Sequence, residues 1–383
     1  MTIVYLDHAA TTPLNRAAFR AMEPWLTGGF GNPSGSHRVA RAARQAVDEA
    51  REVVAQLVGC EPGEIVFTSG GTEADNLAVR GAVAAARRRG RTRAVCSAIE
   101  HHAVLHAVEA EHGRTVGVDA SGRIDLGALR DALGPSTALV SVMLANNEVG
   151  TLQDLAAVRD VVADRAPHAF LHTDAVQATA WLDLVREAAP AQLVSVAAHK
   201  FGGPQGVGAL VVRRGVDLEP LLHGGGQERE RRSGTHNVAG IVGMAAALAA
   251  VAGDRDEAAT KVARQRDRLV SGIRAALDGI TETAAGTSRL PNIAHLRVAG
   301  VESEALVVLL DDLGVCASAG SACASGAVEP SHVLSAMGVA RDEARSALRL
   351  SLGRATTDED IERAVDAVTV GVRRLRAPVA ASH

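Results

Sequence analysis

The chain has 383 residues, of which 47% are hydrophobic, and its formal net charge at pH 7 is −4. This length exceeds that of one typical hydrophobic core, so we expect two domains. The small net charge excludes a strong overall attraction to nucleic acid or to an anionic membrane, and neither is an expected partner.

The sequence also bears on cellular location. Residues 1–5 lack the basic segment and apolar core of a signal peptide, and the longest apolar run, 238–253, is shorter than the roughly 20 residues of a membrane span. No C-x-x-C pair occurs among the four cysteines, Cys60, Cys96, Cys316 and Cys323. We therefore expect a cytoplasmic protein with reduced thiols, and a buried helix over 238–253.

Strands and helices alternate in the N-terminal part. The helical spacing of apolar residues predicts a helix over 39–57. A strand over 64–68 then runs into the turn Gly70-Gly71-Thr72 and a helix over 74–86. Glycines let backbone N–H groups converge on an anion at a helix N-terminus, so this turn is a candidate phosphate site. Many strand–helix turns look similar, and the turn alone is not specific.

The same alternation continues toward the middle of the chain. Further strands are predicted at 94–98, 138–144, 169–172, 193–197 and 207–212. Alternating strands and helices favour a mostly parallel sheet. Polar residues collect after the carboxyl ends of these strands, which is where open α/β sheets bind ligands.

Two of these strand ends carry an amine and a carboxylate. Lys200 follows the strand over 193–197, and Asp174 follows the strand over 169–172. The ordinary interpretation of an isolated lysine at a strand end is that its amine reaches water. A lysine amine together with an acidic partner for a pyridinium nitrogen is, however, the arrangement that pyridoxal phosphate (PLP) requires. The pair therefore predicts a PLP enzyme.

The composition changes after residue 212. The polar, glycine-rich stretch 222–235 predicts a long irregular loop, which is usually functional or disordered. A charged helix is predicted over 254–277, and an αβ pattern resumes from residue 291. We expect the strand over 3–6 to join the second domain. The predicted domains are a large domain, 15–255, and a small domain formed by 1–14 and 256–383.

Two side chains in the C-terminal part are candidates for chemistry. Cys323 lies among small residues in 317–326, a loop that can expose its thiol; the alternative is a small buried hydrophobe. Arg349 lies inside the strand-like run 347–352. Such an arginine pairs with a carboxylate or phosphate ligand, or forms an internal salt bridge.

Together these features closely resemble the cysteine desulfurases (NifS-like) of the fold-type I, class V PLP enzymes. The resemblance runs from Tyr5 to about residue 358, and Cys323 with its loop is what distinguishes it from PLP enzymes in general. The motifs that carry it lie at 10–13, 30–34, 68–73, 100–101, 146–150, 172–177, 199–200, 224–228, 232–235, 320–323 and 349–354.

The resemblance implies an α/β fold with a mostly parallel seven-stranded sheet flanked by helices, and a smaller α/β C-terminal domain. It also implies residue roles toward PLP. Lys200 would carry PLP, and Asp174 would pair with its pyridinium nitrogen. Gln177 and Asn147 would bind the phenolic oxygen or nearby atoms, and His101 would stack on the ring and move protons.

The phosphate and the substrate complete the implied site. Gly71, Thr72 and His199 would bind the phosphate, with Thr235 supplied by the second subunit of a homodimer. Asn147 would also lie at the substrate, and Arg349 would bind the carboxylate of L-cysteine.

The implied reaction removes sulfur from L-cysteine and releases L-alanine. Cys323 would attack the substrate sulfur as a thiolate and then carry a persulfide, because a thiol is a poor nucleophile. The acceptor would be an iron–sulfur scaffold or an enzyme of tRNA or cofactor thiolation. A loop of small residues suits a sulfur that visits both the cofactor and an outside partner.

Two departures from the family pattern stand out. Ala197 occupies the position where the family usually has Ser or Thr as a phosphate ligand, so PLP is held less tightly or another hydroxyl, such as Ser195, substitutes. The chain also ends soon after Arg376, whereas desulfurases of iron–sulfur assembly carry a longer tail.

Three other functions are compatible with part of these features. A selenocysteine-preferring lyase and a class V aminotransferase share the PLP site, although an aminotransferase needs no Cys323. A non-catalytic sulfur-transfer scaffold needs neither Lys200 nor Asp174. Purified PLP protein is yellow, which distinguishes the enzymes from the scaffold.

Overall fold

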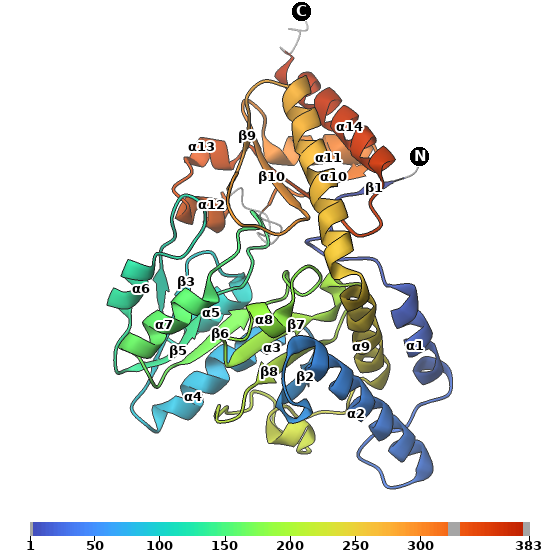
Figure 1. Ribbon diagram of the computed structural model, residues 1–383, viewed down its shortest axis with the longest axis vertical. Helices are drawn as coiled ribbons and strands as arrows, with labels where there is room; N and C mark the ends of the chain where they lie inside the picture. Colours follow the sequence, from blue (N-terminus) through green and yellow to red (C-terminus); the bar gives the residue numbers. More distant parts are fainter. Residues whose placement is uncertain (1–2, 321–329, 378–383) are drawn as a thin grey trace, which may run out of the picture.

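The computed structural model describes residues 3–320 and 330–377. Its largest element is a seven-stranded sheet (Figure 1). In spatial order the strands are β2 (Ile65–Thr68), β8 (Gly208–Val212), β7 (Leu193–Ala197), β6 (Phe170–Asp174), β5 (Thr137–Ser141), β3 (Arg93–Ser97) and β4 (Arg114–Val116). The five from β7 to β4 are parallel, and β8 is antiparallel to both of its neighbours. The expected α/β fold with a mostly parallel sheet is confirmed.

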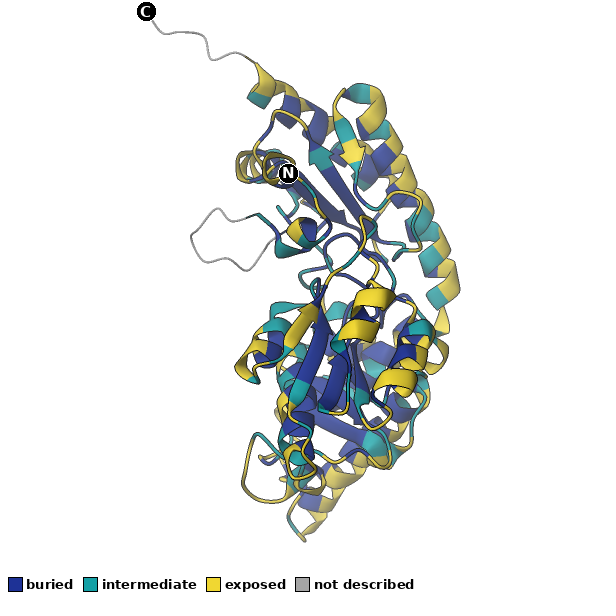
Figure 2. Ribbon diagram, turned by 90° about the vertical axis from the view of Figure 1, so that its left-hand side faces the viewer, coloured by how far each residue is buried: buried dark blue, intermediate teal, exposed yellow. Residues whose placement is uncertain are grey.

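Helices cover both faces of this sheet, and its strands are largely buried apart from the edge strand β4, where Arg114 and Thr115 are exposed (Figure 2). Side chains of β7 point to opposite faces of the sheet. Leu193 packs in the core cluster on one face, and Val194 and Val196 pack in the cluster on the other. The helices of this part are α1 (Arg16–Thr27), α2 (Arg38–Val58), α3 (Gly71–Asn76), α4 (Ala82–Arg87), α5 (His102–Ala110), α6 (Leu126–Ala132), α7 (Leu155–Arg165), α8 (Leu184–Glu187) and α9 (Val238–Gly253). A π-helical turn, η2 (Leu77–Gly81), joins α3 to α4, and 3-10 turns occur at η1 (Pro62–Glu64), η3 (Ala198–Lys200) and η4 (Gln227–Glu230).

The C-terminal part contains a smaller antiparallel sheet in the order β12 (Ala347–Ser351), β10 (Ile293–Val298) and β9 (Ile280–Glu282). Its helices are α10 (Arg255–Ala276), α11 (Ser303–Asp312), α12 (His332–Ala336), α13 (Arg341–Ala344) and α14 (Asp358–Arg376). The N-terminal strand β1 (Val4–Tyr5) pairs in parallel with β11 (Val315–Cys316). The start of the chain therefore lies with its C-terminal part, while the domain boundary near residue 255 remains a prediction.

The apolar run 238–253 forms α9, which is largely buried and packs against α1 and α2. In the described part of the chain, no single helix is long and apolar enough to cross a membrane. Only α9 and α10 together meet the requirements of length and composition, and they bend by 73° relative to each other.

The contact between α9 and α1 is close because of a glycine. A β-carbon at Gly243 would lie 2.5 Å from Cγ and 2.6 Å from Sδ of Met22, whereas at Gly253, the last residue of α9, it would meet no atom within 4 Å. Gly243→Ala should lower the free energy of unfolding by about 1 kcal/mol or more, because overpacking typically costs ~1–3 kcal/mol. Gly253→Ala, the control, should be neutral or stabilise by up to about 1 kcal/mol. Urea unfolding of both variants tests this, and equal effects would contradict the close packing.

Candidate active site

The ends of β6 and β7 meet the N-terminal segment at one place. The amine of Lys200 donates to the carbonyl oxygens of Ala9 at 2.6 Å and Ala10 at 2.8 Å. The amide of Gln177 donates to the same Ala9 oxygen at 2.7 Å. Nδ1 of His199 lies 3.1 Å from the hydroxyl of Thr11. The structure thus brings Lys200, Gln177 and His199 together, as the sequence predicts.

Backbone geometry fixes the turn after Lys200. Gly202 adopts a left-handed conformation with φ 83°, and a β-carbon there would lie 3.0 Å from Asn15. The hydroxyl of Thr12 donates to the carbonyl of His199 and accepts from the N–H of Gly202. These contacts hold the N-terminal segment against the turn, so the carbonyls that face Lys200 are positioned by residues on both sides.

Asp174 is a buried carboxylate close to two cationic or protonatable groups. It is 6% exposed, and its Oδ1 accepts the N–H of Val176 at 2.8 Å. Burial raises the pKa of Asp174, whereas His101 and Lys200 act in the opposite direction. A buried carboxylate requires a cationic or hydrogen-bonding partner to remain ionised. A pyridinium N–H meets that requirement.

His101 is held at the start of α5. Its Nδ1 accepts the N–H of Ala103 at 3.1 Å, so a neutral ring carries its proton on Nε2. Burial lowers the pKa of His101, which favours this neutral form. The preceding turn is fixed by the carboxyl of Glu100, which accepts from the hydroxyl of Ser97 and the N–H of Met143. Burial raises the pKa of Glu100 to about 8.

The turn between β2 and α3 lies near His101, across a cavity that both line. Thr72 and His101 line one cavity of about 340 Å³, and the amide of Asn76 ties the two segments by donating to the carbonyls of Thr72 and Ala103. Gly70 has φ 150°, and a β-carbon there would meet no atom within 4 Å. This open turn at the start of the helical run 71–87 is suited to a phosphate.

The hydroxyl of Ser195, a possible substitute for the one missing at position 197, already contacts another side chain. Ser195 is fully buried, and its Oγ lies 2.9 Å from Nε2 of His172, behind the site. Ala197 itself lies next to the turn between β2 and α3, since its Cβ would be 3.6 Å from a β-carbon at Gly71. Position 197 thus faces the turn without a polar group.

Arg349 lies in β12 and is 2% exposed. One terminal nitrogen pairs with Oδ1 of Asp7 at 2.8 Å, and the other donates to the carbonyl of Asn147 at 3.1 Å. The internal salt bridge considered from the sequence is therefore present, and Arg349 lies beside Asn147. Its Nε has no partner among the described atoms. Its role as a substrate ligand remains a prediction.

Two predicted residues are not brought to this site. Thr235 is exposed, and it does not line the cavity that holds Thr72 and His101. Cys323 lies outside the described residues. Of its flanking positions, Gly320 lies against Glu148 and His295, and Ser331 donates to Glu148.

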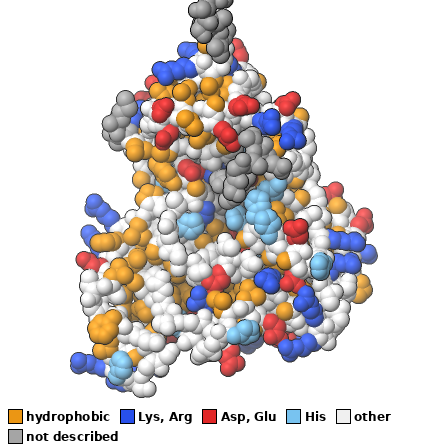
Figure 3. Space-filling model, turned by 180° about the vertical axis from the view of Figure 1, so that it is seen from behind, with side chains coloured by type: hydrophobic (Ala, Val, Ile, Leu, Met, Phe, Trp, Pro, Cys, Tyr) orange, Lys and Arg blue, Asp and Glu red, His pale blue; other side chains and the backbone are white. Residues whose placement is uncertain are grey.

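Histidine rings connect α5 to the C-terminal part, and Figure 3 shows histidine side chains gathered on this face. The ring of His102 lies 5.2 Å from that of His106 and 4.6 Å from that of His332, between centroids. Nε2 of His332 also contacts the carbonyl of Glu100 at 2.9 Å. Among the described residues, no group of three or more metal-ligating side chains is arranged to hold a metal ion.

The sequence interpretation missed Asp7 and Glu148 as parts of the site. Glu148 lies in a motif that carries the family resemblance, and Asp7 lies three residues before one, but their partners, Ser331 and Arg349, are distant in sequence. Proximity in the fold, which a single sequence does not reveal, is what identifies them.

Comparison with known proteins places the chain in a family. Residues 4–364 match the model of the aminotransferase class-V family. The chain belongs to this family. It is 46% identical to a cysteine desulfurase of Cereibacter sphaeroides over 98% of this chain and 97% of that protein. It is 44% identical to an IscS-like cysteine desulfurase of Mycobacterium tuberculosis, with the same coverage of each. A solved NifS-like protein superposes with a TM-score of 0.89 and 34% identity, covering 96% of this chain and 99% of that one.

The comparisons confirm the resemblance to NifS-like cysteine desulfurases that the motifs indicate. The buried Asp174, the amine of Lys200 and the open turn at Gly70 fit PLP, the cofactor of this enzyme class. The individual residue roles remain predictions.

Glu148 generates a pH-dependent prediction. It is 3% exposed, and burial raises its pKa to about 7 although Ser331 and Arg349 act in the opposite direction. The folded protein therefore keeps a proton that the unfolded chain releases above its ordinary pKa of 4.5. Stability relative to Glu148→Gln should fall as pH rises from about 4.5 to about 7, by on the order of 1–3 kcal/mol. Urea unfolding across this range measures the difference.

The control for this experiment is Glu52→Gln, at an exposed position of α2. The difference between that variant and the wild type should stay constant over the same pH range. A constant difference for Glu148→Gln as well would show that the folded protein does not retain a proton on Glu148.

Proposed function

We propose that this protein is a PLP-dependent cysteine desulfurase. It would convert L-cysteine to L-alanine and transfer the sulfur to Cys323 as a persulfide. The observation that carries this proposal is the meeting of Lys200, Gln177 and His199 beside the buried Asp174, at the carboxyl ends of adjacent parallel strands. The similarity to cysteine desulfurases over nearly the whole chain supports the substrate.

Each side chain would have a defined task toward the cofactor. Bound PLP supplies an electron sink for the bond changes at the substrate Cα and Cβ. Lys200 would hold PLP and move the Cα proton, while the carboxylate of Asp174 would stabilise positive charge at the pyridinium nitrogen. His101 would cover the ring as a neutral imidazole. Gln177 would donate from a carboxamide that the Ala9 carbonyl already orients.

The phosphate would lie at the turn formed by Gly71 and Thr72. Burial, followed by the nearby Lys200, lowers the pKa of His199 to about 4, so the ring is neutral at pH 7 and donates one N–H. Thr235, which is exposed on a single chain, would complete the site from the second subunit of a homodimer.

The sulfur transfer balances without an added oxidant or reductant. The thiolate of Cys323 attacks the sulfur of the substrate, so that an S–S bond forms and the Cβ–S bond breaks. The electron pair of the broken bond remains on carbon and takes up a proton, which gives alanine. Arg349 and Asn147 would hold the substrate amino acid during this step. Part of the Arg349 guanidinium is engaged by Asp7, which orients it.

The last step is delivery of the sulfur to an acceptor. The persulfide would pass to an iron–sulfur scaffold or to an enzyme of tRNA or cofactor thiolation. The described cysteines, Cys60, Cys96 and Cys316, are all free. Cysteines without disulfide partners are usual in proteins of a reducing compartment, and we propose a cytoplasmic location.

The chain contains only two lysines, Lys200 and Lys261, which makes the attachment of PLP easy to map. Reduction of the PLP-loaded protein with borohydride should place the pyridoxyl group on the Lys200 peptide alone. Lys200→Ala should lose the visible absorbance of lysine-bound PLP, and Lys261→Ala, the control, should retain it. An unchanged spectrum in Lys200→Ala would rule out Lys200 as the attachment site.

A second prediction concerns the thiol. Cys323→Ser should keep the absorbance of bound PLP but release less than about a hundredth of the alanine formed by the wild type, because a hydroxyl is a far weaker nucleophile than a thiolate. Cys316→Ser, in the strand β11, should retain activity. Alanine release at the wild-type rate by Cys323→Ser would contradict the persulfide mechanism.

A further inference from the structure

A buried ion pair connects the segment 226–236 to the strand that leads into the phosphate turn. Arg51 of α2 and Glu228 are 7% and 5% exposed. Two parallel hydrogen bonds join them, from Nη2 to Oε1 at 2.6 Å and from Nη1 to Oε2 at 2.8 Å. A bidentate pair of this kind fixes the orientation of both the guanidinium and the carboxylate.

The same carboxylate also contacts the strand β2 and the residue after Thr235. Its Oε2 accepts the N–H of Phe67 at 3.0 Å, while Arg51 donates to the carbonyl of Ile65 at 2.8 Å. Its Oε1 lies 2.7 Å from Nε2 of His236. Burial would raise the pKa of Glu228, but the bonds from Arg51 and His236 outweigh it and lower the pKa to about 2. Glu228 is therefore ionised. It connects β2, which leads to Gly71 and Thr72, with His236, which follows Thr235, and the proposed function assigns these residues on both sides to the phosphate.

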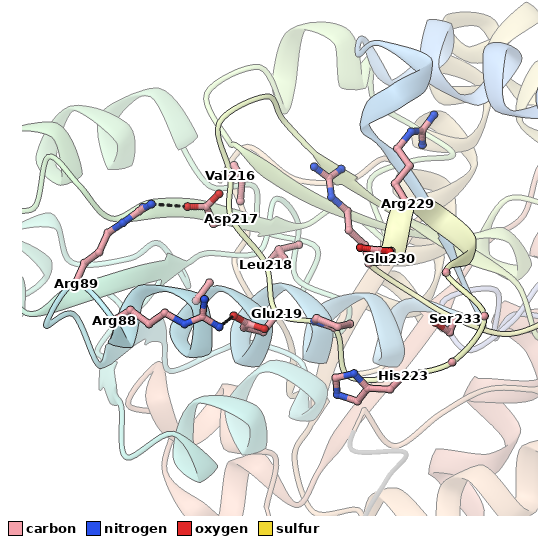
Figure 4. A pocket seen from close by; sticks show the side chains of 16 residues that line it. Arg88, Arg89, Val216, Asp217, Leu218, Glu219, His223, Arg229, Glu230 and Ser233 are labelled. Carbon is pink, nitrogen blue, oxygen red and sulfur yellow. Dashed lines mark hydrogen bonds and ion pairs between the residues drawn. The ribbon is translucent and has the colours of Figure 1, made fainter.

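The backbone around Glu228 adopts an unfavourable conformation. Glu228, Arg229 and Glu230 have φ values of 49°, 58° and 66°, in the left-handed region that side chains with a β-carbon disfavour. One side of this segment lines a cavity of about 890 Å³, with Arg229, Glu230 and Ser233 among the lining residues (Figure 4). On that side the segment faces open space, whereas the carboxylate of Glu228 is buried and bonded to Arg51, Phe67 and His236.

A second ion pair ties the segment to the phosphate turn itself. Nε of Arg232 lies 2.8 Å from Oε1 of Glu73, and the other oxygen of Glu73 accepts the N–H of Ser69 at 2.7 Å. Thr72 lies between Ser69 and Glu73 in the chain. The segment 226–236 therefore contacts residues on both sides of the turn. Glu228 binds Phe67 before the turn, and Arg232 binds Glu73 after it.

We propose that Glu228 is a positioning residue for the phosphate of PLP, acting on two sites at once. Within its own subunit it holds β2 so that Gly71 and Thr72 receive the phosphate. Through His236 it also holds Thr235 in place for the second subunit. This inference rests on the proposed function, because it assumes a PLP-binding homodimer.

The test compares two ligands that differ only in the phosphate. Apo protein is titrated with PLP and with pyridoxal, and binding is followed by absorbance. Glu228→Gln should weaken the binding of PLP by about tenfold or more, as expected when hydrogen bonds to a charged group are lost. Its affinity for pyridoxal should change by less than about twofold, because Lys200, Asp174 and His101 are untouched.

The matched control is Glu282→Gln. Glu282 has a side chain that is 8% exposed and pairs with two arginines, Arg274 and Arg289, but it lies in β9 of the C-terminal sheet. Its substitution should leave the affinities for both ligands unchanged. If Glu228→Gln does not fold, His236→Ala removes only the contact on the Thr235 side and should show the same selective loss of PLP affinity.

Heterodimers separate the two actions. In one heterodimer, Glu228→Gln and Lys200→Ala are on the same chain. PLP can then attach only to the unaltered chain, whose site has a normal β2 but receives Thr235 from the altered chain. In the other heterodimer the two substitutions are on opposite chains, so the chain that keeps Lys200 has the altered β2 and receives a normal Thr235. PLP affinity should fall in both heterodimers, and a fall in only one would overturn the double role.

The results also distinguish this inference from the proposed function. Equal loss of PLP and pyridoxal affinity, or no loss, in Glu228→Gln would overturn the positioning role while wild-type binding of PLP leaves the proposed function standing. A wild-type protein that binds neither ligand would overturn both.

Discussion

The site depends on how the start of the chain is held against the ends of the central strands. The carbonyls of Ala9 and Ala10 face the amine of Lys200, and Ala9 also orients Gln177. The same segment begins in β1, which pairs with β11, and Asp7 binds Arg349 of β12. One short segment therefore connects the C-terminal part to the residues at the carboxyl edge of the large sheet.

The second constraint on the site is the burial of three carboxyl groups. Asp174, Glu100 and Glu148 are all nearly inaccessible, and burial raises the pKa of each. Glu100 and Glu148 are compensated by hydroxyl or backbone donors that hold turns in place. Asp174 differs because it faces His101 and Lys200, so a cationic ring bound between them would favour its ionised form.

The sequence predicted six of the seven strands of the large sheet because their apolar runs end in polar residues, and it predicted Lys200 and Asp174 because their residue types are unusual at such ends. It missed the edge strand β4, whose residues Arg114 and Thr115 are exposed and polar. It did not predict the helices α7 and α14, although both are regular in the structure. The pairing of Arg349 with Asp7 joins residues 342 positions apart, and that of Arg51 with Glu228 joins residues 177 apart. Periodicity and local motifs carry no information on such contacts, nor on the contact between the Ser195 hydroxyl and His172.

The most direct test of the central claim is a single turnover of L-cysteine by PLP-loaded protein without reductant, followed by intact and peptide mass measurement. The account predicts that each chain gains the mass of one sulfur atom, that the sulfur maps to Cys323, and that one alanine is released for each sulfur gained. Alanine release without a sulfur on the chain, or sulfur on Cys60, Cys96 or Cys316 in place of Cys323, would contradict it.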